Sequence, residues 1–303
     1  MTDPRISAVI CTFGRETLLA SAIASLARQT LPCTDYEIVV VDNASRDGTP
    51  ALLATMSAKI ANLRPIDEPV LGVARARNTG ARAARAPLIA YLDDDAQADA
   101  GWLEAALAAF AEAPEVGCIG GPVRPRWPES RPRWLSAPLL SYLAIIDLGA
   151  TRRPLAAGEW LAGTNAVFRK TALAAVGGFC ESLGRRGRTL LSGEDVEIVA
   201  SLMAAGWPVV YDPDLVIHHT IPLERLTVRW FARRAFWQGI SEAVARRDLA
   251  GDGLPPHAVP RQDAEGLSAV RLVCAASRRL GRVVGRGRGP NRERSGDHGD
   301  AAR

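Results

Sequence analysis

The sequence lacks long apolar runs and paired cysteines. Of its 303 residues 48% are hydrophobic, yet no segment approaches the ~18 uninterrupted apolar residues that a membrane span needs, so we expect none. The five cysteines are scattered, odd in number and without a C-x-x-C pair. This argues against a disulfide framework and a structural zinc site, and favours a reducing compartment. Residues 1–13 contain only a very short apolar run and no cleavage pattern, so we expect no signal peptide and a cytoplasmic protein.

An excess of charge of either sign is also missing. The net charge is only +4, which is too even a balance to indicate a nucleic-acid partner, although eight of the last 26 residues are arginine. There is no internal repeat, and no G-x-G-x-x-G follows the first apolar stretch, which argues against a dinucleotide-dependent oxidoreductase. A mean hydropathy near zero at this length predicts a soluble globular protein with one large or two modest domains.

The first hundred residues alternate between short β-branched stretches and segments with helical spacing. The expected strands are 6–13, 36–43 and 87–95, and the expected helices are 16–29, 44–56 (capped by Ser45 or Asp47, with Pro50 in its first turn) and 72–86. This alternation predicts an α/β fold with a mostly parallel, doubly wound sheet, whose ligands bind at the carboxyl ends of the strands. Thr12, Asp42 and Asp93–Asp95 all fall at that edge.

The rest of the chain is less regular. We expect a helix after Asp99, a strand over 159–170, a helix starting near Glu194 and a strand over 207–220. A long basic amphipathic helix (223–247) and a weaker helical stretch (264–284) follow, and the composition of the last ~20 residues predicts disorder.

Three adjacent carboxylates, Asp93, Asp94 and Asp95, repel one another and need water, a shared proton or a cation between them. Two explanations of this cluster are about equally favoured by the sequence: a strand end in contact with solvent, and a metal-binding site. Mg²⁺ and Mn²⁺ commonly bridge a protein carboxylate to phosphate oxygens. On an extended backbone Asp93 and Asp95 share a face while Asp94 points away, so one of the two can touch the metal and the other a sugar hydroxyl.

Two further stretches carry groups that suit a nucleotide. Asp42 either caps the following turn or accepts the imide N–H of uracil or thymine. Arg75, Arg77 and Asn78 form either a solvated helix face or an anion site at a helix N-terminus.

The second half of the chain holds candidates for catalysis and acceptor binding. Glu194 and Asp195 follow a glycine and are either simple capping residues or a general base. Of His218 and His219 at most one can join a site, because neighbouring strand residues face opposite sides. Thr164 and Asn165 belong to ordinary sheet or contact an acceptor.

Taken in order, several stretches resemble the inverting family 2 glycosyltransferases, which have the nucleotide-binding fold called GT-A. They are "VICTFGR", "IVVVDNASRDGT", "GVARARNTG", "LIAYLDDDA", "WLAGTNAVFRK", "GGFCESLGRRGRTLLSGED" and "VIHHTIP". The resemblance covers residues 6 to about 222. It implies a GT-A domain over 1–222, with a nucleotide-binding half (1–98) and an acceptor and catalytic-base half (99–222). The basic helix (223–250) and an Arg/Gly-rich extension (251–303) complete the chain.

The resemblance also implies roles for individual residues. Asp195 is the expected catalytic base, beside Glu194, while Asp93 contacts the ribose, and Asp95, with Asp93 and His219, holds Mg²⁺ or Mn²⁺ on the diphosphate. The nucleotide is held by Thr12, Asp42 and Arg75 or Asn78, with Phe13, Arg15 and Asp94 beside them, and the acceptor is contacted by Trp160, Thr164 and Asn165. The implied reaction is metal-dependent, inverting transfer of a sugar, from a UDP- or dTDP-linked donor, to a hydroxyl of a glycan, lipid carrier or natural product.

Other functions compete with this one. A sugar-1-phosphate nucleotidyltransferase usually carries a glycine-rich loop after its first strand, and "CTFGRETLL" is poor in glycine. A non-catalytic nucleotide-sugar-binding protein has no need of the Glu194–Asp195 pair. Attachment of the basic C-terminal helices to the inner membrane face is a minority interpretation beside a packed helix with a solvated arginine face.

Overall fold

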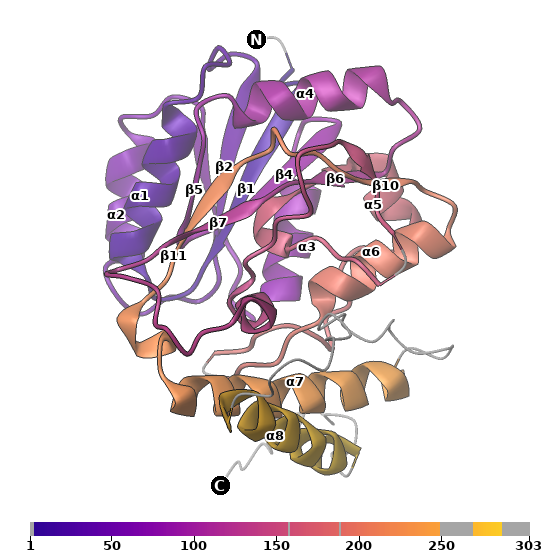
Figure 1. Ribbon diagram of the computed structural model, residues 1–303. Coiled ribbons are helices and arrows are strands. Elements are labelled where there is room, and N and C mark those ends of the chain that lie inside the picture. The colour runs from indigo at the N-terminus through magenta and orange to yellow at the C-terminus, as the bar shows by residue number, and fades with distance from the viewer. Residues whose placement is uncertain (1–2, 157, 188, 249–268, 287–303) are drawn as a thin grey trace, which may run out of the picture.

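The computed structural model describes residues 3–156, 158–187, 189–248 and 269–286, and its centre is an eight-stranded sheet (Figure 1). The strand order is β3-β2-β1-β4-β9-β6-β10-β8. The four strands β1 to β4 pair in parallel, whereas β9 runs antiparallel to both of its neighbours. The bounds are β1 (Ile6–Thr12), β2 (Tyr36–Asp42), β3 (Leu63–Asp67), β4 (Leu88–Asp93), β6 (Cys118–Gly120), β8 (Arg153–Pro154), β9 (Ala166–Arg169) and β10 (Val209–Tyr211).

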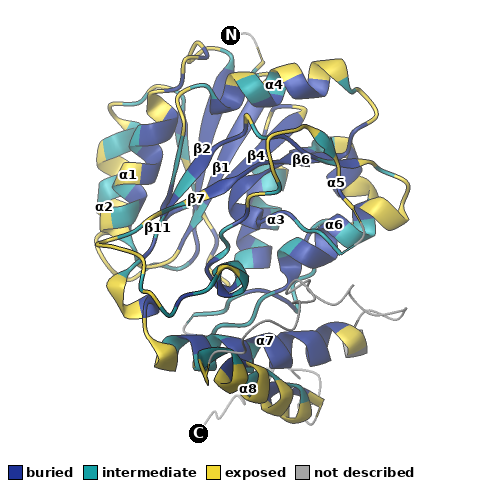
Figure 2. Ribbon diagram, in the orientation of Figure 1, coloured by how far each residue is buried: buried dark blue, intermediate teal, exposed yellow. Residues whose placement is uncertain are grey.

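Helices cover both faces of this sheet, so its central strands are buried along almost their whole length (Figure 2). In β1, Ile10 and its alternate neighbours pack on one side with α1 and α4, and Val9 packs on the other with α3. Burial on both faces explains why the central strands are nearly continuous apolar runs. The helices are α1 (Glu16–Ala27), α2 (Thr49–Ser57), α3 (Val73–Ala83), α4 (Trp102–Glu112), α5 (Lys170–Ala175) and α6 (Glu194–Ala204).

A second, three-stranded sheet joins distant parts of the chain. It has the order β5-β11-β7, formed by Ala96–Ala98, Ile217–Thr220 and Val123–Arg126. His219 pairs with Ala96, and the Thr220 N–H donates to the Asp95 carbonyl oxygen at 2.8 Å. The second sheet therefore brings His219 beside the acidic triplet. Three short 3-10 helices complete this part: η1 (Ala137–Leu143), η2 (Gly163–Asn165) and η3 (Leu223–Arg225).

Two helices follow the sheets. α7 (Val228–Asp248) lies between the body of the protein and α8 (Ala269–Arg286) (Figure 1). Glycines let these two helices touch closely, because a Cβ atom at Gly281 would overlap the carbonyl oxygen of Phe236, and one at Gly239 would overlap that of Arg278. Within the described part of the chain, no helix is both long enough and apolar enough to cross a membrane.

The predicted fold class, an α/β sheet flanked by helices with C-terminal helices added, is confirmed, but several elements differ. The predicted strand 159–170 is wrong in its first half, which forms η2 before the short β9. The predicted strand 207–220 divides into β10 and β11, which belong to different sheets. Gly48, rather than Ser45 or Asp47, precedes α2, while Pro50 lies in its first turn as expected. The helix predicted over 264–284 is α8, and the predicted disordered tail lies outside the described residues.

Candidate functional site

A cavity of about 380 Å³ opens where β1 and β4 end. Thr12 and Asp93 end these strands, and the cavity reaches across to Asp195 at the start of α6 and Arg225 in η3. The cavity thus lies at the edge where the sequence places a ligand site, the carboxyl ends of parallel strands, and the loops after these strands surround it.

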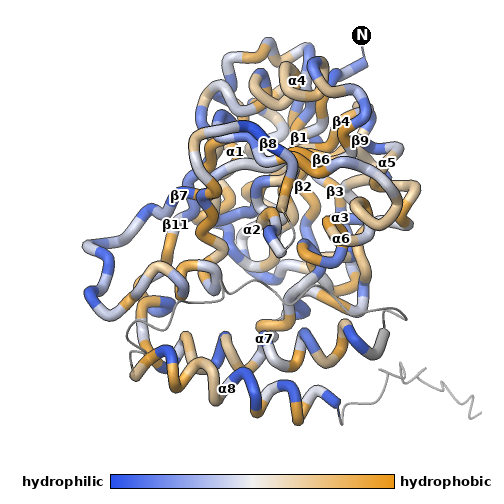
Figure 3. The backbone as a smooth tube through the Cα atoms, turned by 45° about the vertical axis from the view of Figure 1, so that its right-hand side comes forward, coloured by the Kyte–Doolittle hydropathy of each residue, from blue (hydrophilic) through white to orange (hydrophobic). Residues whose placement is uncertain are grey.

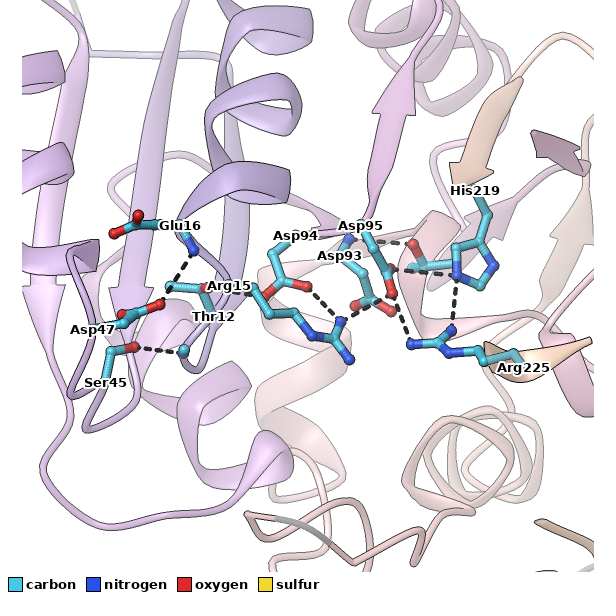
Figure 4. Close-up of polar contacts among 12 residues, drawn as sticks. Thr12, Arg15, Glu16, Ser45, Asp47, Asp93, Asp94, Asp95, His219 and Arg225 are labelled. Carbon is cyan, nitrogen blue, oxygen red and sulfur yellow. Dashed lines mark hydrogen bonds and ion pairs between the residues drawn. The ribbon is translucent and has the colours of Figure 1, made fainter. Parts of the chain in front are cut away.

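The acidic triplet is not extended, which corrects one expectation. β4 ends at Asp93, and the chain turns at Asp94 and Asp95, so these two carboxylates, rather than Asp93 and Asp95, lie together. Arg15 Nη1 donates to Asp94 Oδ1 and to Asp95 Oδ2, each at 2.9 Å (Figure 4). Thr12 Oγ1 donates to Asp94 Oδ2 at 2.8 Å. Part of the repulsion within the triplet is thus balanced by a cation of the protein itself.

Asp95 lies among three cationic or polar partners. Besides Arg15, Arg225 Nη2 donates to Asp95 Oδ2 at 3.2 Å, and His219 Nε2 is 3.4 Å from Asp95 Oδ1. Burial alone would raise the pKa of Asp95, but His219, Arg15 and Arg225 hold it well below its ordinary value. For Asp94 burial outweighs Arg15 and raises the pKa to about 6. Of the two carboxylates, Asp95 therefore stays ionised to the lower pH.

The surroundings of His219 fit a divalent cation. Its Nε2 lies 3.4 Å from Arg225 Nη1 and 3.4 Å from Asp95 Oδ1. One nitrogen cannot both accept from Arg225 and donate to Asp95. If Nε2 carries no proton, no hydrogen bond joins it to the carboxylate, and a cation would take the lone pair in place of the Arg225 N–H. The 3.4 Å between Nε2 and Oδ1 is close to the ~3 Å that separates two ligands at right angles on one ion at ~2.1 Å. Within the described residues no group of three His, Cys, Asp or Glu side chains is placed to hold a metal ion, and Asp95 and His219 are the pair that lies close enough to share one.

Arg77 joins Asp93, at the end of β4, to Glu194, at the start of α6. We call the end of the cavity that contains Thr12 and Asp93–Asp95 the donor end. Arg77 Nη1 donates to Glu194 Oε1 at 2.9 Å and its Nη2 to Asp93 Oδ1 at 3.2 Å. The guanidinium is buried, whereas the side chain of Asp93 remains 39% exposed toward the cavity. Glu194 is therefore committed to an ion pair, and Asp93 keeps an accessible carboxylate.

Asp195 is the acid of the cavity that lacks a cationic partner among the described residues. Its Oδ1 accepts the Val196 N–H at 2.9 Å, and its Oδ2 the Gly163 N–H at 3.4 Å. Burial raises its pKa to about 6, the charge of Glu194 adds to the rise, and Arg77 opposes it. A carboxylate that is ionised at neutral pH and more basic than usual is suited to accept a proton.

Of the three predicted acceptor residues, two line the cavity and one does not. Trp160 and Thr164 line the cavity, and Thr164 Oγ1 accepts the Asp93 N–H at 3.2 Å. Asn165 is fully buried away from it, where its amide joins Trp102 Nε1 to the carbonyl oxygens of Pro122 and Leu215. Its role is to fix the packing of α4 and the loops beside β9.

Three predicted nucleotide residues lie outside the lining of the cavity. Arg75 pairs with Glu68 and Glu181, and Asn78 donates to and accepts from the backbone of Phe179. Asp42 is buried and accepts the Ser45 N–H at 3.0 Å, while Phe13, Arg15 and Asp94 do line the cavity.

The sequence reasoning missed the arginines of the C-terminal half. Arg185, Arg225 and Arg234 all line the cavity. Arg234 donates to Ser192 Oγ at 3.2 Å and Gln238 Oε1 at 3.0 Å, and burial lowers its pKa to about 10. The only sequence signal was an excess of arginine in loops and in a helix, where a solvated face is the ordinary explanation.

Comparisons with known proteins agree on one family. The family described as "Glycosyl transferase family 2" matches residues 7–177. The succinoglycan biosynthesis protein ExoM of Rhizobium meliloti is 27% identical over 235 residues, which are 76% of this chain and 71% of that protein. The glucosyl-dolichyl phosphate glucuronosyltransferase of Haloferax volcanii is 24% identical over 256 residues, 79% and 77% of the two chains.

Several solved structures share this fold, and two of them contain a nucleotide sugar. The mannosyltransferase PcManGT from Pyrobaculum calidifontis, in complex with GDP-Man and Mn²⁺, superposes with a TM-score of 0.62 at 23% identity, over 91% of this chain and 74% of that one. S. aureus TarS 1–349 in complex with UDP-GlcNAc superposes with a TM-score of 0.57 at 17% sequence identity, over 81% of this chain and 71% of that one. At these identities the likeness concerns the fold.

Proposed function

Because the chain belongs to glycosyl transferase family 2, we propose that it transfers a sugar from a nucleotide-diphosphate sugar to an acceptor hydroxyl with inversion at the anomeric carbon. The observation that carries this proposal is that one cavity contains two carboxylates in different surroundings. Asp95 is paired with arginines beside the end of β4, and Asp195, at the start of α6, has no ion pair with any described residue. These are the requirements of a leaving diphosphate and of a nucleophile that must lose a proton.

The donor diphosphate would be held with a divalent cation by Asp95 and His219. The two side chains supply one oxygen and one nitrogen, and the substrate's phosphate oxygens and water would complete the shell, as is usual for Mg²⁺ and Mn²⁺. Bound there, the cation would stabilise charge on the leaving phosphate. Arg15 and Arg225, which already contact Asp95, lie close enough to share in the same stabilisation.

Asp195 would take the proton of the acceptor hydroxyl. A hydroxyl is a weak nucleophile near neutral pH, so direct attack on the anomeric carbon needs a positioned base. A single displacement opposite the departing diphosphate inverts the configuration. Glu194 is a poor candidate for this role because Arg77 occupies its carboxylate.

The proposed donors are uridine and thymidine diphosphate sugars. Asp42 is buried outside the lining, but its chain neighbour Asn43 lines the cavity, so a base entering beside Asn43 would come close to it. Asp42 uses Oδ1 to accept the Ser45 N–H, and no described residue donates to its Oδ2. That oxygen can accept the imide N–H of a pyrimidine. Asp93, exposed toward the cavity, is suited to the ribose hydroxyls.

The proposed acceptor is a hydroxyl of a glycan, a lipid carrier or a natural product. The names of the relatives include succinoglycan biosynthesis and a dolichyl phosphate-linked sugar, so glycans and carrier-linked sugars come first. The acceptor half of the cavity contains Trp160 and Tyr142, whose flat rings suit the faces of sugar rings.

The proposal is tested by incubating the protein with a panel of nucleotide sugars and measuring the nucleotide diphosphate released. We expect slow hydrolysis of one or more of them with divalent metal, reduced in Asp95→Asn. Synthesis of a nucleotide sugar from a sugar 1-phosphate and a nucleoside triphosphate would replace the proposal with the nucleotidyltransferase. Tight binding of a nucleotide sugar without hydrolysis or transfer, over a broad acceptor panel, would favour the non-catalytic alternative.

A further inference from the structure

The outer face of α8 is apolar, and none of the described residues covers it. Five of its side chains are between 39% and 67% exposed: Leu272, Val273, Leu280, Val283 and Val284. At 3.6 residues per turn they project within an arc of roughly 120°. Figure 2 shows the outer side of α8 as exposed, and Figure 3 shows apolar and polar residues alternating along it. Large apolar side chains grouped on one exposed face mark an interaction surface.

The side of α8 that faces α7 is different in kind. Gly281, Gly285 and Cys274 are buried there, and the two glycines approach the backbone of α7. Arg278 Nε donates to Glu242 Oε1 at 2.7 Å, and Arg282 Nη1 is 3.3 Å from Glu242 Oε2. The helix is therefore fixed in rotation, so the apolar arc cannot turn inward without breaking these contacts.

Arginines border the apolar arc. α8 contains five arginines and neither Asp nor Glu, and at helical spacing the arginines project within an arc of roughly 100° next to the apolar one. Arg279 and Arg286 are exposed. An apolar face edged by arginine matches the boundary between the acyl chains and the headgroups of an anionic membrane.

We propose that α8 docks this face on an anionic lipid bilayer, with Leu272, Leu280 and Val283 in the acyl boundary and Arg279 and Arg286 on the headgroups. A second copy of the chain is a poorer occupant. Two such faces would bring arginines together with no acidic residue of α8 to meet them, and like charges oppose such an interface.

Docking would place the cavity close to the membrane. Arg234 and Gln238 of α7 line the cavity, while Gly239 and Glu242 of the same helix contact α8. Packed helices lie about 8–10 Å apart, so the cavity would open within roughly two helix layers of the lipid surface. An acceptor carried on a lipid could then reach it, a consequence that rests on the proposed function.

Vesicle co-sedimentation tests the proposal with the full chain. We expect binding to vesicles of phosphatidylcholine mixed with the anionic lipid phosphatidylglycerol, little binding to pure phosphatidylcholine, and weaker binding as salt is added. The triple variant Leu272→Gln, Leu280→Gln and Val283→Gln keeps good helix formers on solvent-exposed positions and should bind at least about tenfold more weakly. The double variant Arg279→Gln and Arg286→Gln should bind the anionic vesicles about fivefold more weakly for each charge removed.

The matched control replaces exposed apolar side chains elsewhere. Met203→Gln with Leu223→Gln, at positions 43% and 59% exposed, should bind vesicles as the parent does. Far-UV circular dichroism and thermal unfolding verify that every variant is folded. Parent protein that ignores anionic vesicles at low salt would overturn the proposal. A triple variant that binds the vesicles as well as the parent does would also overturn it. The assay contains no sugar donor, so its failure leaves the glycosyl transfer untouched.

Discussion

Replacing Asp195 by Asn removes the proposed base while keeping the size of the side chain and an oxygen that can accept the Val196 N–H. A positioned base contributes ~10²–10⁴-fold to a rate, so we expect turnover to fall at least ~100-fold. Donor and metal should bind nearly as in the parent, because the donor-end contacts of Asp95 do not involve Asp195. Released nucleotide diphosphate gives the rate, and calorimetry gives the affinity.

The fall of kcat/KM at acid pH also tests whether Asp195 is the base. Burial and the charge of Glu194 raise the pKa of Asp195 to about 6. Because the base must be ionised, kcat/KM should fall about tenfold per pH unit below roughly pH 6. Glu194→Gln removes one cause of the raised pKa, so it should move this fall to lower pH.

Loss of activity in Asp195→Asn should not come from misfolding. The raised pKa of Asp195, from 3.8 to about 6, means that the ionised form is disfavoured in the folded protein. Stability is therefore lost as the pH rises through about 6, by up to on the order of 3 kcal/mol at pH 7. A neutral Asn avoids this loss, so Asp195→Asn should unfold at or above the parent's temperature at pH 7.5, and the difference should close between about pH 6 and pH 4.

The reasoning fails if Asp195→Asn transfers sugar at the parent rate, which would make Glu194 the next candidate in spite of its ion pair with Arg77. It also fails if the fall of kcat/KM at acid pH stays in place in Glu194→Gln while the fold is intact.

Three further predictions concern the donor, the metal and the tail. Removal of divalent metal by a chelator should abolish turnover and weaken binding of the nucleotide diphosphate, with both restored by Mg²⁺ or Mn²⁺; full activity in chelator after verified metal removal contradicts the site at Asp95 and His219. UDP or dTDP should bind more tightly than GDP in calorimetry, because Asp42 can accept from a pyrimidine imide, and the reverse order refutes that role. Truncation beyond about Pro290, outside the described residues, should leave soluble turnover unchanged, since the segment has little apolar area to join a core; a folded truncation that loses turnover refutes it.

The sequence by itself determined the first half of the fold. Strands β1, β2 and β4 and helices α1 and α3 were predictable because hydrophobic period and length are local properties of the chain. The edge that carries Thr12 and Asp93 followed from the rule that parallel strands bring their carboxyl ends together. The short β3, β5, β6 and β7 were missed, because three to five residues hold too little periodicity.

Tertiary structure alone decided how the side chains of the cavity face one another. Asp95 meets Arg225 across 130 positions of sequence because β11 pairs beside β5. The turn after β4 put Asp94 with Asp95, and a strand-based argument cannot foresee where a strand ends to the residue. The role of Asn165 could not be predicted from the sequence either, because only the packing shows that its amide is hydrogen-bonded to Trp102 and to two carbonyl oxygens. Residue type and order are written in the chain, but the partner of each polar group depends on contacts between segments that no local pattern encodes.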